Sequence, residues 1–299
     1  MDVDSSGSED GKIWCAIDSM FVPRSLFKAT RTLPISNNKY KKRVGAKTAK
    51  KLEMSEHSEF TLSREDATMY RALAARCNYL SQDRPDITFS SKELCREFSI
   101  PNLNSFKKLK RLCRYLAGLP RLVYRYKWQD MPDRIDVFVD TDFAGCKETR
   151  RSTSGGTVML GDCCVKHWSK TQTTIALSSG EAELSGIAAG TAQALGIQSL
   201  MRDMGWIVKV VIHSDATAAI GIARRKGLGK IRHLDVSDLW IQDMIRSKRV
   251  DLVKVLGTEN MADVLTKYVD RTSMLRALDK MGLIKMTGRP ACAPAAVGA

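Results

Sequence analysis

The sequence predicts an α/β fold in which a mixed five-stranded sheet is flanked by helices. Five short β-branched runs lie between residues 135 and 256 of the 299, and helical patterns separate the later ones. Their order, three strands followed by helix, strand, two helices, strand and helix, predicts a sheet that is antiparallel at first and parallel later. Helices are expected on both of its faces.

Each element has a local signal in the sequence. The strands are expected at 135–140, 157–160, 165–168, 208–214 and 251–256, with turns at Gly155-Gly156 and Gly161-Asp162. Ser178 begins a Ser-x-x-Glu pattern, which predicts the start of a long helix that runs to about Met204. Further helices are expected near 217–223, near 234–246 and from about Asn260.

Composition divides the chain into four segments: 1–54, 55–130, 131–285 and 286–299. The first is polar and then basic without an apolar period, and the last is rich in proline and small residues, so both are predicted to be disordered. The second is predicted to be helical. Ser63 is expected to cap one of its helices, and Pro85 is expected to separate that helix from another that starts near Ile87.

The net charge of +15, from 48 Lys and Arg against 33 Asp and Glu, favours a polyanionic partner, either nucleic acid or an acidic membrane surface. An amphipathic helix around 106–116 carries a basic outer face formed by Lys107, Lys108, Lys110, Arg111 and Arg114. Such charges either keep a surface helix soluble or follow a nucleic-acid backbone, and the overall charge favours the second interpretation.

Other features exclude several classes of protein. No stretch has the roughly 18 continuous apolar residues of a membrane span, and the acidic start lacks a signal-peptide pattern, so an intracellular protein, cytoplasmic or nuclear, is expected. Eight cysteines without CxxC spacing predict reduced thiols. Cys163, Cys164 and His167 resemble a metal cluster only weakly, because structural zinc requires four ligands.

Four acids are expected to gather at one edge of the sheet. Asp140 and Asp215 end two strands that should be parallel neighbours, Glu183 lies in the first turns of the long helix, and Asp263 lies early in a late helix. Carboxylates held together repel one another unless hard cations lie among them, and oxygen ligands suit Mg²⁺ or Mn²⁺. Two such ions, roughly 3.5 to 4 Å apart, catalyse in-line phosphoryl displacement without a protein nucleophile.

Several segments resemble successive signatures of the ribonuclease H domain in copia-type retrotransposon Pol polyproteins. They are VDTDFAG (139–145), RSTSGG (151–156), LSSGEAEL (177–184), HSDATAAI (213–220), IRHLDV (231–236) and MADVLTK (261–267). The stretch from Tyr70 to Tyr126 is similar to the end of the reverse transcriptase upstream of that domain. The resemblance therefore implies a ribonuclease H-like fold over 131–285, preceded by a helical reverse-transcriptase connection segment over 55–130.

The resemblance also implies residue roles and partners. Asp140, Glu183, Asp215 and Asp263 match the family's metal-binding quartet for two Mg²⁺ or Mn²⁺ ions, and Glu181 and Asp142 are ranked second. Arg150, Arg151 and Ser152 would lie near an RNA–DNA hybrid, whose RNA strand is cut. The other expected partner is the remaining Pol polyprotein, with its reverse transcriptase palm and integrase. No membrane partner is expected.

Departures from the family's pattern leave alternatives open. The loop 257–260 lacks the histidine that many cellular ribonucleases H carry there, which puts turnover in doubt. A Tyr-x-Asp-Asp motif is absent, so no polymerase activity is expected. The alternatives are a catalytically inactive nucleic-acid-binding relic and an integrase-like strand-transfer enzyme. The intact carboxylates oppose the first, and the helix position of Glu183 opposes the second.

Overall fold

The structure is a computed structural model that describes residues 62–227, 229 and 236–287. The chain splits into two compact units. The first contains the described residues 62–79, Glu93–Arg121 and Thr287, and the second contains Leu80–Lys92 and Leu122–Met286. The predicted arm at 1–54 lies outside the described residues, as do residues 231–235 of the segment IRHLDV and the part of the predicted tail from 288 onward.

The first unit consists of helices, as predicted. It contains α3 (Arg64–Leu80) up to Tyr79, the end of α4 (Pro85–Cys95), and α5 (Leu103–Gly118). The hydroxyl oxygen of Ser63 accepts a hydrogen bond from the Asp66 amide at 3.1 Å, which confirms the predicted cap. Helix α4 begins at Pro85, two residues before the predicted start, because the first helical turn needs no amide donor from proline.

Helix α5 has the predicted amphipathic form. The Asn102 side chain accepts hydrogen bonds from the amides of Asn104 and Ser105, which fixes the start of the helix. The apolar face is buried, and its residues include Leu109, Leu112, Cys113 and Leu116. On the opposite face the basic side chains are exposed or partly exposed: Lys107, Lys108, Lys110, Arg111 and Arg114. Lys108 also forms an ion pair of 2.6 Å with Glu97.

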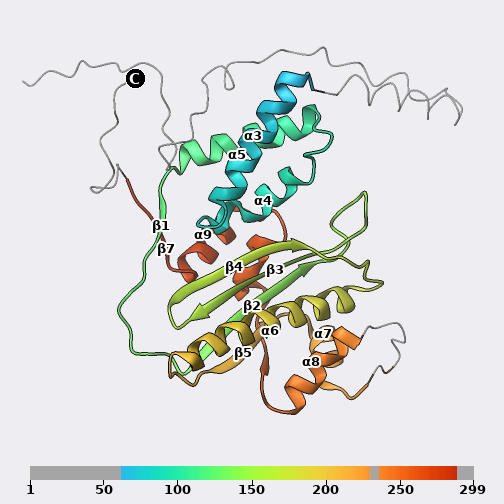
Figure 1. The fold of residues 1–299 in the computed structure, drawn as a ribbon, viewed down its shortest axis with the longest axis vertical. Coiled ribbons are helices and arrows are strands. Elements are labelled where there is room, and N and C mark those ends of the chain that lie inside the picture. Colours follow the sequence, from blue (N-terminus) through green and yellow to red (C-terminus); the bar gives the residue numbers. More distant parts are fainter. Residues whose placement is uncertain (1–61, 228, 230–235, 288–299) are drawn as a thin grey trace, which may run out of the picture. The chain divides into compact units, whose positions relative to one another are not determined.

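The second unit contains the predicted mixed sheet, with strand order β4-β3-β2-β5-β6 (Figure 1). The strands are β2 (Arg134–Asp142), β3 (Thr153–Leu160), β4 (Cys163–Thr171), β5 (Lys209–Ser214) and β6 (Asp251–Lys254). The pairs β2–β3 and β3–β4 are antiparallel, whereas β2–β5 and β5–β6 are parallel. The predicted topology is therefore confirmed.

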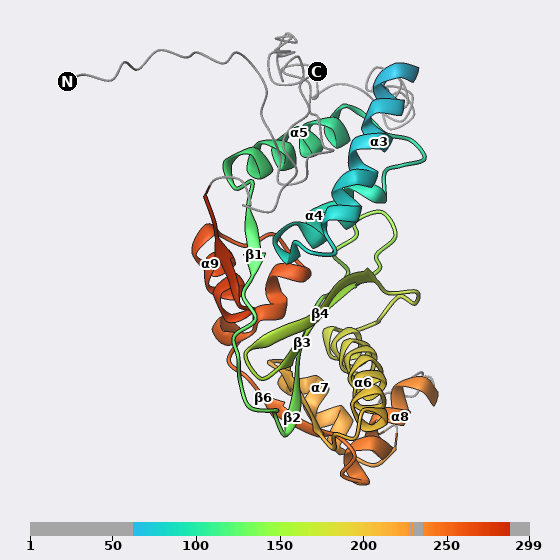
Figure 2. The ribbon, with the colours of Figure 1, turned by 60° about the vertical axis from the view of Figure 1, so that its left-hand side comes forward.

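Helices cover both faces of this sheet, as predicted (Figures 1 and 2). On one face, α6 (Ser179–Asp203), α7 (Thr217–Arg224) and α8 (Val236–Arg246) bury Val137, Val139 and Val158. On the other face, α9 (Arg271–Lys280) and the short helix η2 (Met261–Leu265) pack against Met159 and Cys164. Successive residues of one strand thus belong to different cores, which is the alternation that a covered sheet requires.

The predicted turn at Gly155-Gly156 is wrong, because both glycines lie inside β3. A Cβ atom on Gly155 would lie 2.7 Å from the Leu265 Cβ, and one on Gly156 would lie 2.1 Å from the Trp168 ring. These glycines therefore allow close packing instead of reversing the chain. The turn at Gly161-Asp162 is confirmed, and Gly161 has a φ of 59° there.

Two further elements differ from the prediction. Instead of one helix from Asn260, the chain forms the 3-10 helices η1 (Gly257–Glu259) and η2, and α9 then begins at Arg271 after the Asp270 cap. Strands β1 (Leu122–Tyr124) and β7 (Leu283–Lys285) form an antiparallel pair within regions expected to lack strands. None of the helices among the described residues has the length and apolarity needed to cross a membrane.

Helix α6 approaches the sheet through a glycine, which leads to a stability prediction. A Cβ on Gly190 would lie 2.5 Å from Val139 Cγ1, and because the β-branched valine is stiff, Gly190→Ala is expected to lower the free energy of unfolding by about 1–2 kcal/mol. Gly196 in the same helix has nothing within 4 Å of its Cβ position, so Gly196→Ala is expected to stabilise by about 0.5–1 kcal/mol. Urea unfolding followed by circular dichroism measures both, and equal effects would contradict this packing.

Candidate active site

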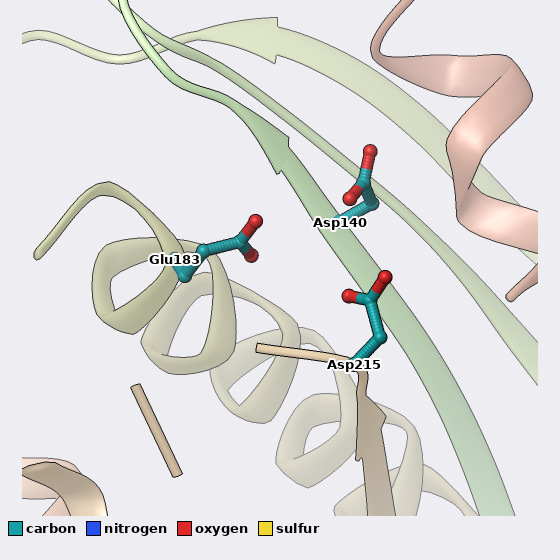
Figure 3. Close-up of side chains that lie close together, drawn as sticks. All are labelled: Asp140, Glu183 and Asp215. Atoms are coloured by element: carbon teal, nitrogen blue, oxygen red, sulfur yellow. The ribbon is translucent and has the colours of Figure 1, made fainter. Parts of the chain in front are cut away.

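Three of the four predicted acids lie together at one edge of the sheet (Figure 3). Asp140, Glu183 and Asp215 each offer a carboxylate oxygen, and these oxygens lie within 4.8 Å of one another. Within the part of the chain that the structure describes, they form the one group of three or more potential metal-ligating side chains at this spacing. The sequence-based expectation that these acids converge is thus met for the three.

Parallel pairing places Asp140 beside Asp215. Phe138 of β2 is the register partner of His213 of β5, and each aspartate lies two residues beyond its member of that pair. Asp140 is still within β2 and is 4% exposed, whereas Asp215 directly follows the last residue of β5. Figure 3 shows both side chains extending from this end of the two strands toward the same space.

Glu183 reaches this group from helix α6. Ser178 caps the helix by accepting a hydrogen bond from the Glu181 amide. Further along, Gly186 and Gly190 lie three and seven residues after Glu183, and a side chain on either would collide with β2, at Thr141 and Val139 respectively. The missing side chains let α6 lie close to β2, and Glu183 lies on this same close face because the spacings follow the helical repeat.

Asp263 lies beside this group and forms an ion pair with Lys267. It belongs to η2, and its Oδ1 is 3.0 Å from the Lys267 ammonium, which also lies 3.7 Å from Asp140 Oδ2. The negative charges of Asp140 and Asp215 both act on Asp263. The fourth predicted acid is therefore an electrostatic neighbour of the other three.

Sequence reasoning missed two polar residues that hold this arrangement. The hydroxyl group of Thr266, fully buried, donates a hydrogen bond to Asp140 Oδ2. The Asn260 side chain, 4% exposed, donates to the Val139 carbonyl at 2.9 Å and accepts from the Ala262 amide. Both lie in or next to the segment MADVLTK, but no local pattern shows that they contact a strand more than a hundred residues earlier.

Gly155 allows Thr266 to make this contact. Gly155 is the cross-strand partner of Asp140, and because it has no side chain it leaves space next to that carboxylate. A Cβ on Gly155 would lie only 2.8 Å from the Thr266 methyl group, which occupies this space. A glycine interpreted as a turn signal is thus the residue that lets η2 and its following threonine cover Asp140.

Burial and the repulsion of neighbouring charges raise the pKa values of Glu183, Asp215 and Asp263. Burial first, and then the charges of Asp140 and Asp215, raises the pKa of Glu183 to about 9. Burial and Asp140 likewise raise the pKa of Asp263 to about 6, and they raise the pKa of Asp215 above its usual value. Titratable groups with shifted pKa values cluster at functional sites, so these carboxylates mark a candidate active site.

The donor set fits a hard divalent cation. Glu183 Oε2 is buried without a hydrogen-bond partner, so this oxygen is available as a ligand atom. All of the converging donors are carboxylate oxygens, which suit Mg²⁺ or Mn²⁺ better than zinc. These residues could therefore hold the ions that the sequence predicts.

The second-ranked acid Glu181 has a structural position. Its carboxylate accepts hydrogen bonds from the Leu177 amide and the Ser178 hydroxyl, at 2.9 Å each, so it completes the cap of α6. Asp142, the other acid of that rank, lies against Gly145, where an added Cβ would come within 1.6 Å of its Oδ2. Neither acid belongs to the group of three.

The predicted nucleic-acid contacts of the loop after β2 divide into two kinds. Arg150 and Arg151 are exposed, and Arg150 has a φ of 56°. Ser152 is fully buried, and its hydroxyl oxygen accepts a hydrogen bond from the Ala144 amide at 3.1 Å. A direct contact of Ser152 with nucleic acid is therefore corrected to a role in fixing the loop that carries the two arginines.

Two of the four histidines, His167 and His213, lie among the described residues, and each contacts other partners. His213 Nε2 lies 2.7 Å from Asp136 Oδ1, and its ring stacks on Phe138. His167 has both ring nitrogens occupied, by the Ser81 carbonyl and the Tyr124 hydroxyl group. Cys163, Cys164 and His167 thus lie in β4, where both ring nitrogens of His167 contact protein groups.

Comparison with known proteins finds that the chain is similar to transposon polyproteins. It is 28% identical over 225 residues to the retrovirus-related Pol polyprotein from transposon RE1 of Arabidopsis thaliana, a match that covers 74% of this chain and 15% of that protein. It is also 28% identical over 293 residues to the corresponding polyprotein from transposon RE2 of the same plant, covering 95% of this chain and 20% of the relative. The chain thus spans a fifth or less of the length of these relatives.

Two other comparisons complete this result. The N-terminal RNase H domain of rv2228c from Mycobacterium tuberculosis, solved as a fusion with maltose binding protein, is 16% identical at a TM-score of 0.34. That match covers 49% of this chain and 96% of the solved chain. No family model matches the sequence.

Proposed function

Because the chain resembles the copia-type retrotransposon Pol polyproteins, we propose that residues 131–285 of its second unit are a ribonuclease H that hydrolyses the RNA strand of RNA–DNA hybrids. The observation that carries the proposal is the convergence of Asp140, Glu183 and Asp215 at the ends of two parallel strands and the start of a helix. Such a group is costly to bury without a cation, and hard divalent ions catalyse phosphodiester hydrolysis.

The residues of this chain would have distinct roles. Asp140, Glu183, Asp215 and Asp263 would hold two Mg²⁺ or Mn²⁺ ions, which supply activation of water and stabilisation of the leaving oxygen. Thr266 orients the Asp140 carboxylate through its hydrogen bond. Asn260 fastens the loop that carries Asp263 to β2, so the acids from distant segments keep a fixed spacing.

Recognition of the hybrid would rest on phosphate contacts and on the 2′-hydroxyl groups of the RNA strand. We assign phosphate contacts to Arg150 and Arg151 in the second unit and to the basic face of α5 in the first. In this proposal, residues 55–130 are the end of a reverse transcriptase and residues 131–285 are the ribonuclease H domain. Both would act together with the rest of a Pol polyprotein.

Cleavage of a hybrid with different labels on its two strands tests this function. The purified chain is incubated with Mg²⁺, with Mn²⁺ or with a chelator, beside matched DNA and RNA duplexes. We expect metal-dependent cutting of the RNA strand of the hybrid alone. Binding of the hybrid without cutting would support the inactive relic, and cutting or joining of DNA ends would support a strand-transfer enzyme.

The basic face of α5 leads to a binding prediction. Replacing the exposed Lys107, Arg111 and Arg114 together by glutamine is expected to weaken hybrid binding and to reduce the slope of log affinity against log salt by about 2 to 3. Filter binding in the presence of Ca²⁺, at salt concentrations from about 50 to 200 mM, measures this slope. Lys209→Gln, at the far end of β5 from Asp215, is the control, and an unchanged slope in the triple variant would show that α5 is only a solvated surface.

A further inference from the structure

Lys267 places a positive charge next to the carboxylates of Asp140 and Asp263. Its ammonium lies 3.0 Å from Asp263 Oδ1 and 3.7 Å from Asp140 Oδ2, and its side chain is 47% exposed. The Asp140 side chain is only 5% exposed. The Lys267 side chain is thus partly exposed to solvent, while its ammonium lies near the buried Asp140, which belongs to the same group as Glu183 and Asp215.

The local backbone explains this position. The amides of Thr266 and Lys267 both donate to the Asp263 carbonyl at 3.2 Å, which wraps one turn of chain around Asp263. As a result, the Thr266 hydroxyl and the Lys267 ammonium approach the same oxygen, Asp140 Oδ2. Asp263 and Lys267 are four residues apart, a spacing that brings opposite charges together on a helical turn.

A divalent ion at the same place would conflict with this ammonium. Mg²⁺ binds carboxylate oxygens at about 2.0–2.1 Å. If Asp140 and Asp263 held an ion, it would lie on the side of these acids where Lys267 Nζ now lies, 3.7 Å from Asp140 Oδ2 and 3.0 Å from Asp263 Oδ1. The two cations would also repel each other in a partly buried site, where the effective dielectric constant is lower than in water.

We propose that Lys267 is a resident counter-ion of Asp140 and Asp263, and that a divalent ion must displace its ammonium to bind on that side of the group. This inference rests on the proposed function. Lys267 is a positioning residue: it offsets the repulsion between the acids in the metal-free protein, and it lowers the affinity of the free protein for metal. When the ammonium is displaced, the half-exposed side chain of Lys267 can turn it toward solvent.

Calorimetric titration of the metal-free full chain with MgCl₂ at pH 8 tests the inference without any cleavage reaction. Lys267→Met is expected to bind Mg²⁺ roughly two- to fivefold more tightly than the unsubstituted protein, because a half-exposed ion pair has a modest strength. Lys267→Arg keeps the charge and should bind within about twofold of the unsubstituted protein. Lys209→Met removes a lysine at the opposite end of β5 and should leave the affinity unchanged.

The outcomes separate this inference from the proposed function. Tighter binding in Lys267→Met alone supports the inference, whereas equal or weaker binding in Lys267→Met overturns it and leaves the metal site intact. Absence of Mg²⁺ binding in every protein overturns both the inference and the metal-dependent function. Lys267→Gln, titrated in the same way, provides the same comparison with a polar side chain if the methionine variant does not fold.

Discussion

Asp140→Asn is expected to lower the rate of hybrid cleavage at least about a hundredfold while the fold is retained, since a divalent-metal site contributes several kcal/mol to phosphodiester hydrolysis. Asp140 is the most buried acid of the group and the one that Thr266 and Lys267 both contact. Asparagine keeps the size of the side chain but removes its charge, so the substitution should abolish metal binding without disturbing the packing. Single-turnover cleavage of a labelled hybrid measures the effect.

A second aspartate in the same strand provides the matched control. Asp136 forms an ion pair with Arg134 and a hydrogen bond with His213, and it lies outside the group of three acids, so Asp136→Asn should cleave within about threefold of the unsubstituted protein. Circular dichroism confirms that both variants are folded. Cleavage by Asp140→Asn within tenfold of the unsubstituted protein would show that this acid holds no catalytic ion.

Glu183→Gln is expected to stabilise the metal-free protein at pH 8 and to leave its stability unchanged below pH 4.5. Folding raises the pKa of Glu183 from 4.5 to about 9, so the folded state binds this proton more tightly than the unfolded state. The stability that the bound proton contributes is complete below pH 4.5 and is lost as the pH rises toward 9. Glutamine has no proton to lose, so the gain at pH 8 should be about 2–4 kcal/mol.

Urea unfolding in the presence of a chelator, at pH 4 and at pH 8, measures this difference. Glu148→Gln, which changes an exposed glutamate in the loop after β2, should have no effect at either pH. Adding Mg²⁺ at pH 8 should stabilise the unsubstituted protein more than Glu183→Gln, because the ion binds only the folded state and needs this carboxylate. Equal unfolding midpoints at pH 8 without metal would contradict the burial of an ionisable Glu183.

The sheet and the positions of the acids could be predicted because their signals are local. β-Branched runs marked the strands, and Ser178 marked the start of α6, so Glu183 was placed near the strand ends. The parallel pairing of β2 with β5 followed from their order in the chain, and it brings Asp140 beside Asp215. Prediction of the fold therefore required only short-range patterns and general rules of topology.

The contacts that complete the site could not be predicted, because they join segments far apart in the chain. The Thr266 hydroxyl meets Asp140, 126 residues earlier, and Asn260 meets Val139, 121 residues earlier. Gly155 was misinterpreted for the same reason: its closest neighbours are Leu265 and Thr266, so its function is visible only after the chain has folded. A local turn signal and a close tertiary approach both favour glycine.

Strand β1 shows a related limit. Its three residues pair with β7, which lies some 160 positions later, and three residues are too few for an alternating pattern to be recognised. The helix expected from Asn260 shows another. The apolar spacing of Met261, Val264 and Leu265 is helical, but Asp270 caps a separate helix and leaves η2 as a single 3-10 segment.

The most direct test of the metal site is to locate Mn²⁺ by anomalous scattering in crystals of the full chain grown with MnCl₂. We expect an anomalous peak within coordination distance, about 2.0–2.3 Å, of carboxylate oxygens of Asp140, Glu183 and Asp215. We also expect the Lys267 ammonium to have moved away from Asp140 when Asp140 and Asp263 hold an ion. A folded site without manganese among these three acids, at a concentration that supports cleavage, would contradict a metal-dependent site.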